Sequence, residues 1–569
     1  MPAALRCIPL GGLGEIGRNM MVLEYEGDIV IVDVGVMFPE NEMLGVDLVI
    51  PDVSYLMDKL DRIRGVVITH GHEDHTGSLP YVLPQLNFPP VWGTPLTLGL
   101  VNGKLKEHKL HERVQLHTIV PGETVRFGKL EAEFFRVCHS IPDGVGMALR
   151  TPLGLVVHSG DFKFDYTPVD QRPTDFAALS RFGSEGVLCL FADSTHADRP
   201  GYTPSEAVVG EALDGIIGSA RGRVIITTFA SLISRVQQII DAAARHERKV
   251  GIIGRSMVQN VAVAQELGYI KAPPGVLLKP EELSAVGTLP ARSVVIITTG
   301  SQGEPTSALT RMANRDHRQI EIVPGDTVVM SAAPVPGNEE LVSRTIDNLF
   351  RLGANVVWGH GQGAEGSRGT TVHVSGHASQ EELKLMLSLL KPRYFVPIHG
   401  EYRHLILHAR LAQSLGIASE RIMVIEDGDV LEVREETAEV RERVSAGYVF
   451  VDGLGVGDVG QVVLRDRQLL AQDGILIITL TVDRLSGKQI AGPDIVSRGF
   501  VYVRESEELI EKARAQVAAA IEQARVSLEA DTHHVDWQFV KNKIRDTISK
   551  YVYEQTRRRP MILPVVMEV

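Results

Sequence analysis

Four side chains that commonly bind metals fall within six residues of this sequence. His70, His72, Asp74 and His75 lie in the segment 69–75, which directly follows the apolar run 65–68. Imidazole and carboxylate ligands suit zinc or manganese, whereas calcium and magnesium prefer shells made of oxygen atoms. The cluster therefore predicts a metal centre for hydrolysis, in which two neighbouring ions lower the pKa of a water molecule and hold the substrate.

A two-metal centre needs about seven protein ligands, so the cluster requires partners from elsewhere in the chain. His139, Asp161 and His399 each close an apolar strand. Strand ends are where open sheets place their chemistry. A single polar residue at a strand end is more often a cap or a turn residue. Three of them beside the cluster predict one shared site.

The composition restricts the class of protein. A chain of 569 residues with 44% hydrophobic content exceeds one core, which predicts several domains. The net charge of −13 argues only weakly against a polyanionic partner, because metals create a local positive site. The chain shows neither a signal-peptide pattern nor about 20 consecutive apolar residues, which predicts a cytoplasmic protein without a membrane partner. Three scattered cysteines predict neither disulfides nor a thiolate zinc site.

The order of the predicted elements divides the chain. Residues 1–204 alternate short strands with glycine turns and form the first part of one domain. Residues 205–358 alternate helices with buried strands, the pattern of a parallel α/β sheet, and Ser205 is the predicted N-cap of the first helix. Residues 359–430 begin with a Gly-rich link and return to strand ends with ligands, as if completing the first domain. The predicted strands are 21–25, 29–33, 65–69, 125–127, 132–137, 155–159 and 187–192, then 224–228, 250–253, 294–298 and 327–331.

The remaining residues form a linker and a third domain. Residues 431–450 are rich in Glu and Arg and predict a linker or an exposed arm. Residues 451–569 predict a small α+β domain. Its expected strands are 474–482, 500–504 and 561–566, and its expected helices are 506–529 and 537–557.

The segment 12–17 matches the Gly-x-Gly-x-x-Gly pattern of dinucleotide-binding domains, with Asp33 about twenty residues later. Such a domain needs a helix between the glycines and the acid, but residues 18–33 predict a hairpin. We therefore expect these glycines to form a tight turn under the metal site.

The complete pattern resembles a known family. The order Asp33, the 70–75 cluster, His139, Asp161 and His399 resembles the metallo-β-lactamase superfamily. Segments 191–195, 374–377 and 397–401, with the inserted domain, resemble its nucleic-acid-processing β-CASP branch. Segments 228–231, 300–304 and 373–378, with the C-terminal domain, resemble the ribonuclease J family within that branch. The resemblance implies an αββα sandwich with an inserted parallel α/β domain and a small C-terminal α+β domain.

The resemblance also implies a distribution of ligands. One metal would be bound by His70, His72 and His139, the other by Asp74, His75 and His399, with Asp161 as the bridge. Asp33 would hold a ligand histidine by its ring N–H. The sequence departs from the family at Ser234, where we expect a histidine before Arg235.

The implied activity is hydrolysis of RNA phosphodiester bonds, both internally and in the 5′-to-3′ direction from a 5′-monophosphate end, in RNA maturation (ribosomal RNA included) and decay. Asp74 would orient or deprotonate the attacking water. His377, oriented by Asp193, would protonate the leaving 3′ oxygen. The residues expected in a pocket for the terminal phosphate are Ser231, His373, Val374, Ser375, Gly376 and His377. That these are ordinary turn residues stays open.

Several alternatives and partners accompany this interpretation. A hydrolase of small esters or lactams shares the cluster but leaves the inserted domain and His377 unexplained. A DNA nuclease of the same branch stays open, and a non-catalytic scaffold would be expected to lose ligands. The expected partners are single-stranded RNA, zinc and/or manganese, a homodimer or homotetramer formed through the C-terminal domain, and an RNA-degradation complex.

Overall fold

The structure is a computed structural model that describes residues 3–335, 337–359, 362–363, 370–483, 489–501, 507–528 and 537–569. The chain forms two compact units, Met1–Phe38 with Leu48–Val449, and Pro39–Asp47 with Phe450–Val569. Most of the expected Gly-rich link 359–366 lies outside the described residues, as do 502–504, 506 and 529 of the expected C-terminal elements. No helix in the described part of the chain is both long and apolar enough to cross a membrane.

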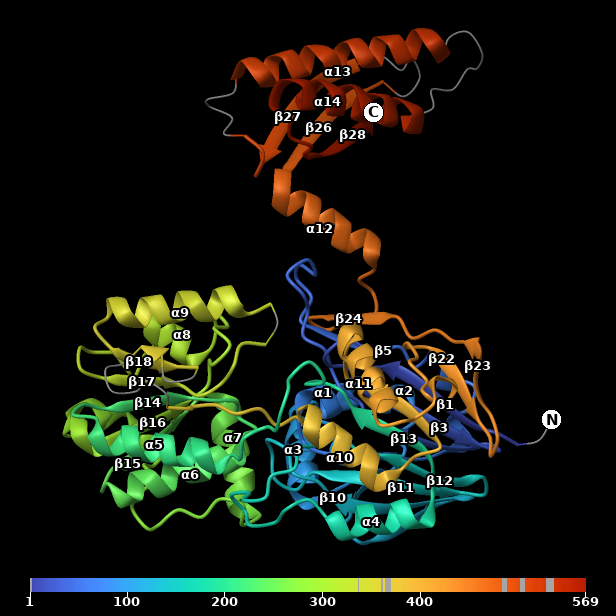
Figure 1. Ribbon diagram of the computed structural model, residues 1–569. Coiled ribbons are helices and arrows are strands. Elements are labelled where there is room, and N and C mark those ends of the chain that lie inside the picture. Colours follow the sequence, from blue (N-terminus) through green and yellow to red (C-terminus); the bar gives the residue numbers. More distant parts are fainter. Residues whose placement is uncertain are drawn as a thin grey trace. The chain divides into compact units, whose positions relative to one another are not determined.

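Two sheets pack face to face in the larger unit (Figure 1). The eight-stranded sheet has the order β23-β22-β1-β3-β4-β6-β7-β8, and the six-stranded sheet has the order β20-β13-β12-β11-β10-β9. Alternate apolar residues of both sheets meet in one shared core. The strands are β1 (Leu5–Gly11), β3 (Met20–Tyr25), β4 (Asp28–Val32), β6 (Ile63–Val67), β7 (Val91–Gly93), β8 (Leu116–Thr118), β9 (Thr124–Phe127), β10 (Leu130–Arg136), β11 (Val145–Thr151), β12 (Gly154–His158), β13 (Val187–Asp193), β20 (Tyr394–Ile398), β22 (Asp429–Val433) and β23 (Ala438–Arg443).

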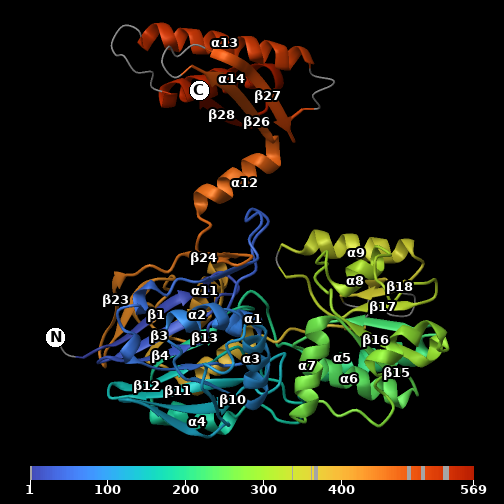
Figure 2. The same cartoon turned by 180° about the vertical axis from the view of Figure 1, so that it is seen from behind.

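Helices cover the outer faces of both sheets. Helices α2 (Leu79–Gln85) and α3 (Pro95–Glu107) pack on the eight-stranded sheet. Helices α4 (Phe176–Glu185), α10 (Gln380–Leu390) and α11 (Tyr402–Ser414) pack on the six-stranded sheet, and Figure 2 shows α4 beneath β10–β12. This is the αββα sandwich that the resemblance implies, which confirms the expected fold class.

The inserted region is a three-layer α/β/α domain. Its sheet has the order β15-β16-β14-β17-β18-β19, and all neighbours are parallel except β18 and β19. Helices α5, α6 and α7 pack on one face, and α8 and α9 on the other (Figure 1). The elements are α5 (Ala207–Ser219), β14 (Val224–Thr227), α6 (Ile233–Arg245), β15 (Lys249–Ile253), α7 (Arg255–Glu266), β16 (Val294–Thr298), α8 (Ala308–Ala313), β17 (Thr327–Met330), α9 (Glu339–Arg351), β18 (Asn355–Trp358) and β19 (Gln362–Gly363).

The topology of the six-stranded sheet explains where the ligands gather. Strands β12, β13 and β20 are parallel neighbours, and Asp193 pairs with Ile398 at their carboxyl ends. The residues that follow these strands, Asp161 and His399, must therefore lie along the same edge as Asp193. Strand β20 comes from after the insertion, so this edge is complete only when the chain returns.

Residues 431–450 differ from the expected linker. They contain the end of β22 and all of β23, which pair antiparallel at the edge of the eight-stranded sheet. Strand β23 buries only Ala438, and an exposed charged edge strand has the composition of a linker. The helix expected from 206 begins at Ala207 with Glu206 at its cap, although Ser205 Oγ still accepts a hydrogen bond from Ala207 N–H.

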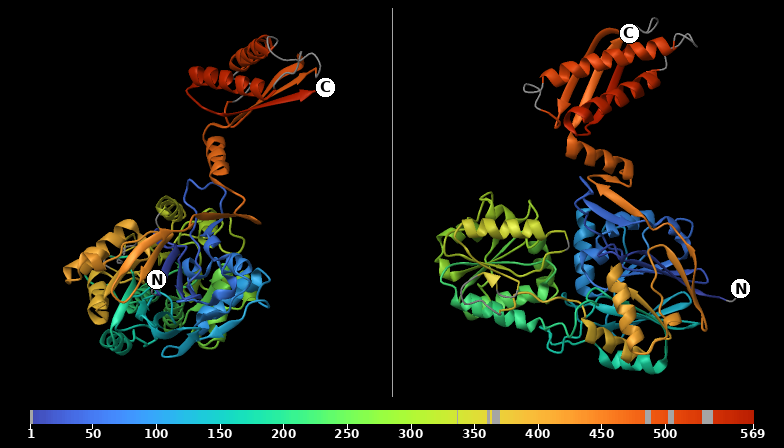
Figure 3. Two further views of the ribbon diagram at one scale, coloured as in Figure 1. Left: turned by 90° about the vertical axis from the view of Figure 1, so that its right-hand side faces the viewer. Right: turned by 45° about the horizontal axis from the view of Figure 1, so that its top comes forward.

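The smaller unit contains a three-stranded sheet of order β27-β26-β28, with α13 and α14 on one face (Figure 3). Its loop 39–47 belongs to this unit because Arg467 and Gln468 of α12 donate to backbone carbonyls in it. Strand β27 was not expected, and Phe500, where a strand was expected, is a bend. The elements are α12 (Gln461–Asp473), β26 (Ile475–Val482), β27 (Gln489–Arg498), α13 (Glu507–Leu528), α14 (Trp537–Thr556) and β28 (Met561–Glu568).

Candidate metal centre

The His70–His75 segment leaves β6 and enters the short helix α1 (Glu73–Thr76). Both terminal imidazoles are buried, His70 at 1% exposure and His75 at 2%. Asp33 fixes the start of the segment, since it accepts hydrogen bonds of 2.8 Å from the backbone N–H and from the hydroxyl of Thr69. The segment is therefore held before any metal binds.

Three imidazoles form what we call the nitrogen group: His70, His72 and His139. His72 Nδ1 lies 3.0 Å from His70 Nε2 and 3.1 Å from His139 Nε2. The outer nitrogen of His139, Nδ1, donates to the Gly376 carbonyl at 2.8 Å. A Cβ at position 376 would lie 2.6 Å from that nitrogen, so this contact requires glycine.

Asp74, His75, Asp161 and His399 form a second cluster, the mixed group. Asp74 Oδ2 lies 3.5 Å from His75 Nε2 and 3.4 Å from His399 Nε2. His399 has a left-handed backbone, φ 55°, and Gly400 follows with φ 134°. This sharp turn at the end of β20 brings the ring back over the carboxylates.

Asp161 lies between the two groups. Its Oδ2 atom is 3.8 Å from both His70 Nε2 and His139 Nε2 in the nitrogen group. The same oxygen is 3.1 Å from His75 Nε2 and 3.6 Å from His399 Nε2. One carboxylate oxygen thus faces both clusters.

Hydroxyl groups fix two of the imidazole tautomers. Thr69 Oγ1 donates to Asp33, so it accepts from His70 Nδ1 at 3.1 Å. Thr195 Oγ1 donates to Asp193, so it accepts from His399 Nδ1 at 2.6 Å. In each ring the outer nitrogen carries a proton, and Nε2 is the nitrogen that lies toward the site.

His75 is oriented by a carboxylate instead. Its Nδ1 lies 2.8 Å from Asp33 Oδ2. Asn19 Nδ2 lies 3.0 Å from the carbonyl oxygen of Asp74 and 3.3 Å from His75 Nε2. Asn19 follows the 12–17 segment, whose β2 (Leu13–Gly14) pairs with β21 (Gly400–Glu401) directly after His399. The glycine turn therefore packs against the mixed group.

The imidazoles of the nitrogen group are neutral. Burial is the largest cause that lowers the pKa of His70, His72 and His139, and neighbouring histidines lower it further. The pKa of His72 falls to about 4. Neutral imidazoles are the form that binds metals.

The mixed group has the opposite electrostatics. Burial alone would lower the pKa of His75 and His399, but Asp161 and other carboxylates raise both, that of His399 to about 9. Burial would raise the pKa of Asp74 and Asp161, yet the histidines hold both well below the ordinary value. Without metals, this group consists of carboxylates balanced by charged imidazoles.

The donor sets fit divalent cations. Nitrogens bound to zinc at 2.0–2.1 Å in a tetrahedral shell are about 3.3 Å apart. In the nitrogen group, His72 Nδ1 lies at nearly that spacing from the Nε2 atoms of His70 and His139, 3.0 and 3.1 Å, and all three nitrogens lie within 4.8 Å of one another. The mixed group supplies harder oxygen ligands beside two imidazoles.

His377 and Asp193 lie at the rim of the centre. His377 Nδ1 is 2.7 Å from Asp193 Oδ2, and its side chain keeps 18% exposure. Burial would lower the pKa of His377, but the carboxylates of Asp193 and Asp161 raise it above the ordinary value. Because Nδ1 bonds to Asp193, Nε2 is the ring nitrogen that is left for another partner.

The expected phosphate-pocket residues do not all face one space. His373 Nδ1 lies 2.9 Å from Arg235 Nη1, and Ser375 Oγ accepts from the backbone N–H of His377 at 3.2 Å. Ser231 is partly exposed in the turn before α6. Val374 packs into the core of the inserted domain at 5% exposure, so its side chain contributes no polar contact.

Sequence reasoning did not identify Thr69, Asn19 or Arg235 as site residues. Thr69 and Asn19 act by contacts across the sheet, which local patterns do not reveal. Arg235 carried a signal, because a charged residue on the apolar face of an amphipathic helix needs a buried partner.

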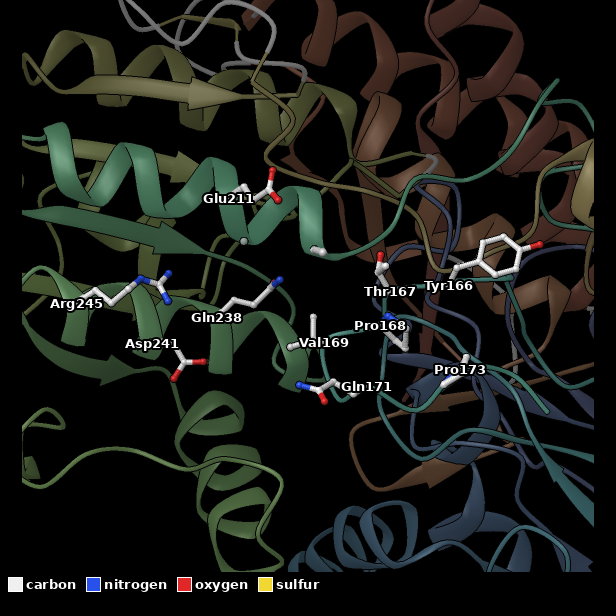
Figure 4. Close-up of a pocket in the computed structure, with 12 residues that line it drawn as sticks. Tyr166, Thr167, Pro168, Val169, Gln171, Pro173, Glu211, Gln238, Asp241 and Arg245 are labelled. Carbon is white, nitrogen blue, oxygen red and sulfur yellow. The ribbon is translucent and has the colours of Figure 1, made fainter. Parts of the chain in front are cut away.

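A separate cavity of about 570 Å³ lies where the loop 166–173 meets α5 and α6. Figure 4 shows Gln238 and Glu211 on the helices opposite Thr167 and Gln171 of the loop. None of the predicted site residues lines it. The candidate centre is thus defined by converging ligands rather than by this cavity.

Family models match four parts of the chain. Residues 42–213 match the beta-lactamase superfamily domain, and 221–349 match the beta-CASP domain of ribonuclease J. Residues 368–423 match the Zn-dependent metallo-hydrolase RNA specificity domain, and 462–569 match the ribonuclease J C-terminal domain.

Full-length relatives agree with these matches. The chain is 46% identical over 565 residues to ribonuclease J2 of Bacillus subtilis, covering 99% of both chains. It is 44% identical over 566 residues to ribonuclease J 1 of Streptococcus pyogenes, covering 100% of this chain and 98% of the relative. A protein of unknown function from Enterococcus faecalis shares the fold at 13% identity, with a TM-score of 0.51 over 76% of this chain and 100% of its own. The chain belongs to the ribonuclease J family, as the motifs predicted.

Proposed function

We propose that this protein is a metal-dependent ribonuclease that hydrolyses RNA phosphodiester bonds. The observation that carries the proposal is the meeting of the nitrogen group and the mixed group at Asp161, in a chain of the ribonuclease J family. A match to an RNA specificity domain supports RNA as the substrate.

The proposed cofactors are two divalent metal ions, zinc and/or manganese. His70, His72 and His139 would hold one, Asp74, His75 and His399 the other, and Asp161 would bridge them. Bound in this way, the pair supplies an activated water and neutralises charge on the phosphate. Asp74, whose side chain is partly exposed, would orient the water or accept its proton.

His377 is the proposed general acid. Its Nδ1–H donates to Asp193, whose carboxylate also accepts from Thr195. This bond orients the ring and leaves Nε2 to deliver a proton to the leaving 3′ oxygen. The carboxylate partner favours the protonated ring, which is the form a general acid requires.

The test of His377 separates proton transfer from metal binding. His377→Ala should lower turnover about 10²–10⁴-fold, the usual contribution of a general acid, while the metal content stays unchanged. The matched variant Asp193→Asn should lose less, because it retains the imidazole. Full turnover of His377→Ala with both metals bound would contradict the role.

The proposed modes are 5′-to-3′ exonuclease action on 5′-monophosphate RNA and internal cleavage. Ser231, His373, Ser375 and the Gly376 backbone would supply hydroxyl, imidazole and amide donors to the terminal phosphate. Ser375 contacts His377, and Gly376 contacts His139. End-labelled RNA with a 5′-monophosphate, a 5′-triphosphate or a 5′-hydroxyl tests the pocket, and the matching DNA oligonucleotide tests the sugar. Equal rates on all three RNA ends would exclude the pocket, and faster cleavage of DNA would favour the DNA-nuclease alternative.

The domain division is also a proposal: 1–204 and 359–430 as the metallo-β-lactamase domain, 205–358 as the insertion and 451–569 as the C-terminal domain. The family matches fall inside these limits except that 42–213 overlaps the insertion by a few residues. We propose self-association through the C-terminal domain. A chain truncated after Val444 that stays oligomeric would contradict it. A cytoplasmic location and an RNA-degradation complex stay predictions of the sequence.

A further inference from the structure

A buried guanidinium holds His373 from behind. Arg235 is 0% exposed, and its Nε and Nη2 donate to the two carboxylate oxygens of Glu206 at 2.7 and 2.8 Å. Its Nη1 donates to the Ser331 carbonyl at 2.7 Å and lies 2.9 Å from His373 Nδ1. All three nitrogen atoms of the guanidinium are thus committed to specific partners.

This contact fixes the tautomer of His373. A guanidinium keeps its protons and has no acceptor, so Nδ1 of the imidazole must accept. The proton of the neutral ring is then on Nε2. A second proton on Nδ1 would place two N–H groups against each other, next to a positive charge.

The surroundings of His373 also favour the uncharged ring. Burial is the largest cause that holds the pKa of His373 well below its ordinary value, and Arg235 is the next. Lys163, Arg199 and His196 face it from other segments and lower it further. Among the described residues, Glu206 is the acid in contact with this arginine, and its two oxygens are already paired with Arg235.

The burial pattern distinguishes His373 from its neighbours. Val372 and Val374 are buried in the core of the inserted domain, whereas His373 and Ser375 are partly exposed. Ser331 Oγ fastens this segment by donating to the Val372 carbonyl at 2.7 Å. Among the described residues, no hydrogen-bond partner is recorded for His373 Nε2.

We infer that Arg235 is a positioning residue of the phosphate pocket, which fixes His373 as an uncharged Nε2–H donor to the terminal phosphate of the RNA. This inference rests on the proposed function, because it requires that the pocket bind a 5′-monophosphate. Recognition by the pocket then depends on the direction of one N–H, not on an imidazolium that deprotonates near neutral pH.

The first experiment is a pH profile of end recognition with the full chain. The quantity is the ratio of exonuclease rates on 5′-monophosphate and 5′-hydroxyl RNA, because effects on the chemical step cancel. Between pH ~7 and ~8.5 the phosphate is already a dianion, since its second pKa is about 6. If the donor is uncharged, the ratio stays constant within about twofold over this pH range. If the donor were an imidazolium with an ordinary pKa near 6.5, the ratio would fall more than about tenfold.

The second experiment uses two arginines with the same buried pairing. Arg235→Lys leaves one ammonium to replace four contacts and should raise KM for 5′-monophosphate RNA about tenfold, with kcat little changed. Arg223→Lys is the control, because Arg223 makes a bidentate pair with Asp326 at the opposite end of β14. Arg223→Lys should leave the ratio of rates on 5′-monophosphate and 5′-hydroxyl RNA unchanged. Cleavage of circular RNA, which has no 5′ end, should fall no further in Arg235→Lys than in Arg223→Lys.

Variants of His373 distinguish the donor from the charge. His373→Gln restores an N–H near the position of Nε2 and should keep part of the preference, whereas His373→Phe should abolish it. If Arg235→Lys does not fold, Glu206→Gln is measured in its place, because it weakens the bidentate pair and should also lower the ratio.

The outcomes separate the two levels of the proposal. A wild-type protein without any preference for the 5′-monophosphate overturns the pocket, and the role of Arg235 with it. A preference that falls more than tenfold with pH, or that Arg235→Lys and Glu206→Gln leave intact, overturns the role of Arg235 while the pocket stands.

Discussion

The nitrogen group and the mixed group lie on two sides of one carboxylate, yet the protein prepares them in opposite ways. The nitrogen group holds three neutral imidazoles, and backbone or hydroxyl oxygens accept the outer protons of His70 and His139. The mixed group holds two carboxylates with two charged imidazoles, and Asp33 accepts from one of those rings.

The difference has a chemical consequence. A metal entering the nitrogen group displaces no protons, whereas a metal entering the mixed group must displace protons from His75 and His399. The oxygen ligands of the mixed group also make it the harder site, which suits manganese, while the nitrogen group suits zinc. We therefore expect the two groups to differ in the pH dependence of metal binding and in metal preference.

The largest expected effect is the loss of the shared ligand. Asp161→Asn should deplete both metals and lower turnover on the order of 10³-fold or more, because its oxygen faces both groups. His72→Ala, which touches the nitrogen group alone, is the matched control and should deplete one metal. The measurement is metal content per chain together with turnover. Retention of one metal in Asp161→Asn would show that the groups are independent.

The next effect concerns the carboxylate behind His75. Asp33→Asn removes the negative charge that accepts its Nδ1 proton and should weaken the metal of the mixed group about 10–100-fold. The metal of the nitrogen group should weaken less, because Asp33 reaches His70 through Thr69. Competition with a chelator measures each affinity in turn. We expect the chelator to remove the metal of the mixed group first. If it removed the metal of the nitrogen group first, Asp33 would not be the main support of His75.

In metal-stripped protein the two groups should titrate in opposite directions. The ring of His72 should stay neutral until pH falls to about 4, and that of His399 should stay protonated until pH rises to about 9. Because the pKa of His72 is lowered in the folded protein, the free energy of unfolding decreases as pH falls from about 6.5 toward 4. Because the pKa of His399 is raised in the folded protein, this ring increases the free energy of unfolding below about pH 6.5. That contribution is lost as pH rises from about 6.5 through 9. Side-chain nitrogen NMR measures the pKa values of His72 and His399, and equal values would contradict the difference between the two groups.

The smallest expected effect compares two hydroxyl groups. Thr69→Val and Thr195→Val each remove the acceptor of one outer imidazole proton, at 3.1 and 2.6 Å respectively. A neutral hydrogen bond contributes about 1 kcal/mol, so each variant should weaken its own metal about three- to tenfold. The shorter contact predicts the larger loss for Thr195→Val. Calorimetric titration of each variant measures the difference.

The sequence predicted the parts of this centre that follow local rules. His70–His75 are neighbours in the chain, and His139, Asp161 and His399 could be assigned because each ends a strand. The contacts of Thr195 and Arg235 with their histidines depend on side-chain packing between segments far apart, which periodicity does not encode. Segment 438–443 looked like a linker because an edge strand protects itself with charge.

The position of the insertion also shapes how the protein is made on the ribosome. Leu5 of β1 pairs with Val433 of β22, roughly 430 residues later, and β13 pairs with β20 from the far side of the insertion. At ~5–20 residues per second, translation of the insertion takes on the order of tens of seconds, during which both sheets of the nascent sandwich have an open edge. His399 is also absent throughout this interval, so a nascent chain holds an incomplete mixed group. The enzyme's catalytic centre is therefore closed late in synthesis, by the same returning strand that seals its six-stranded sheet.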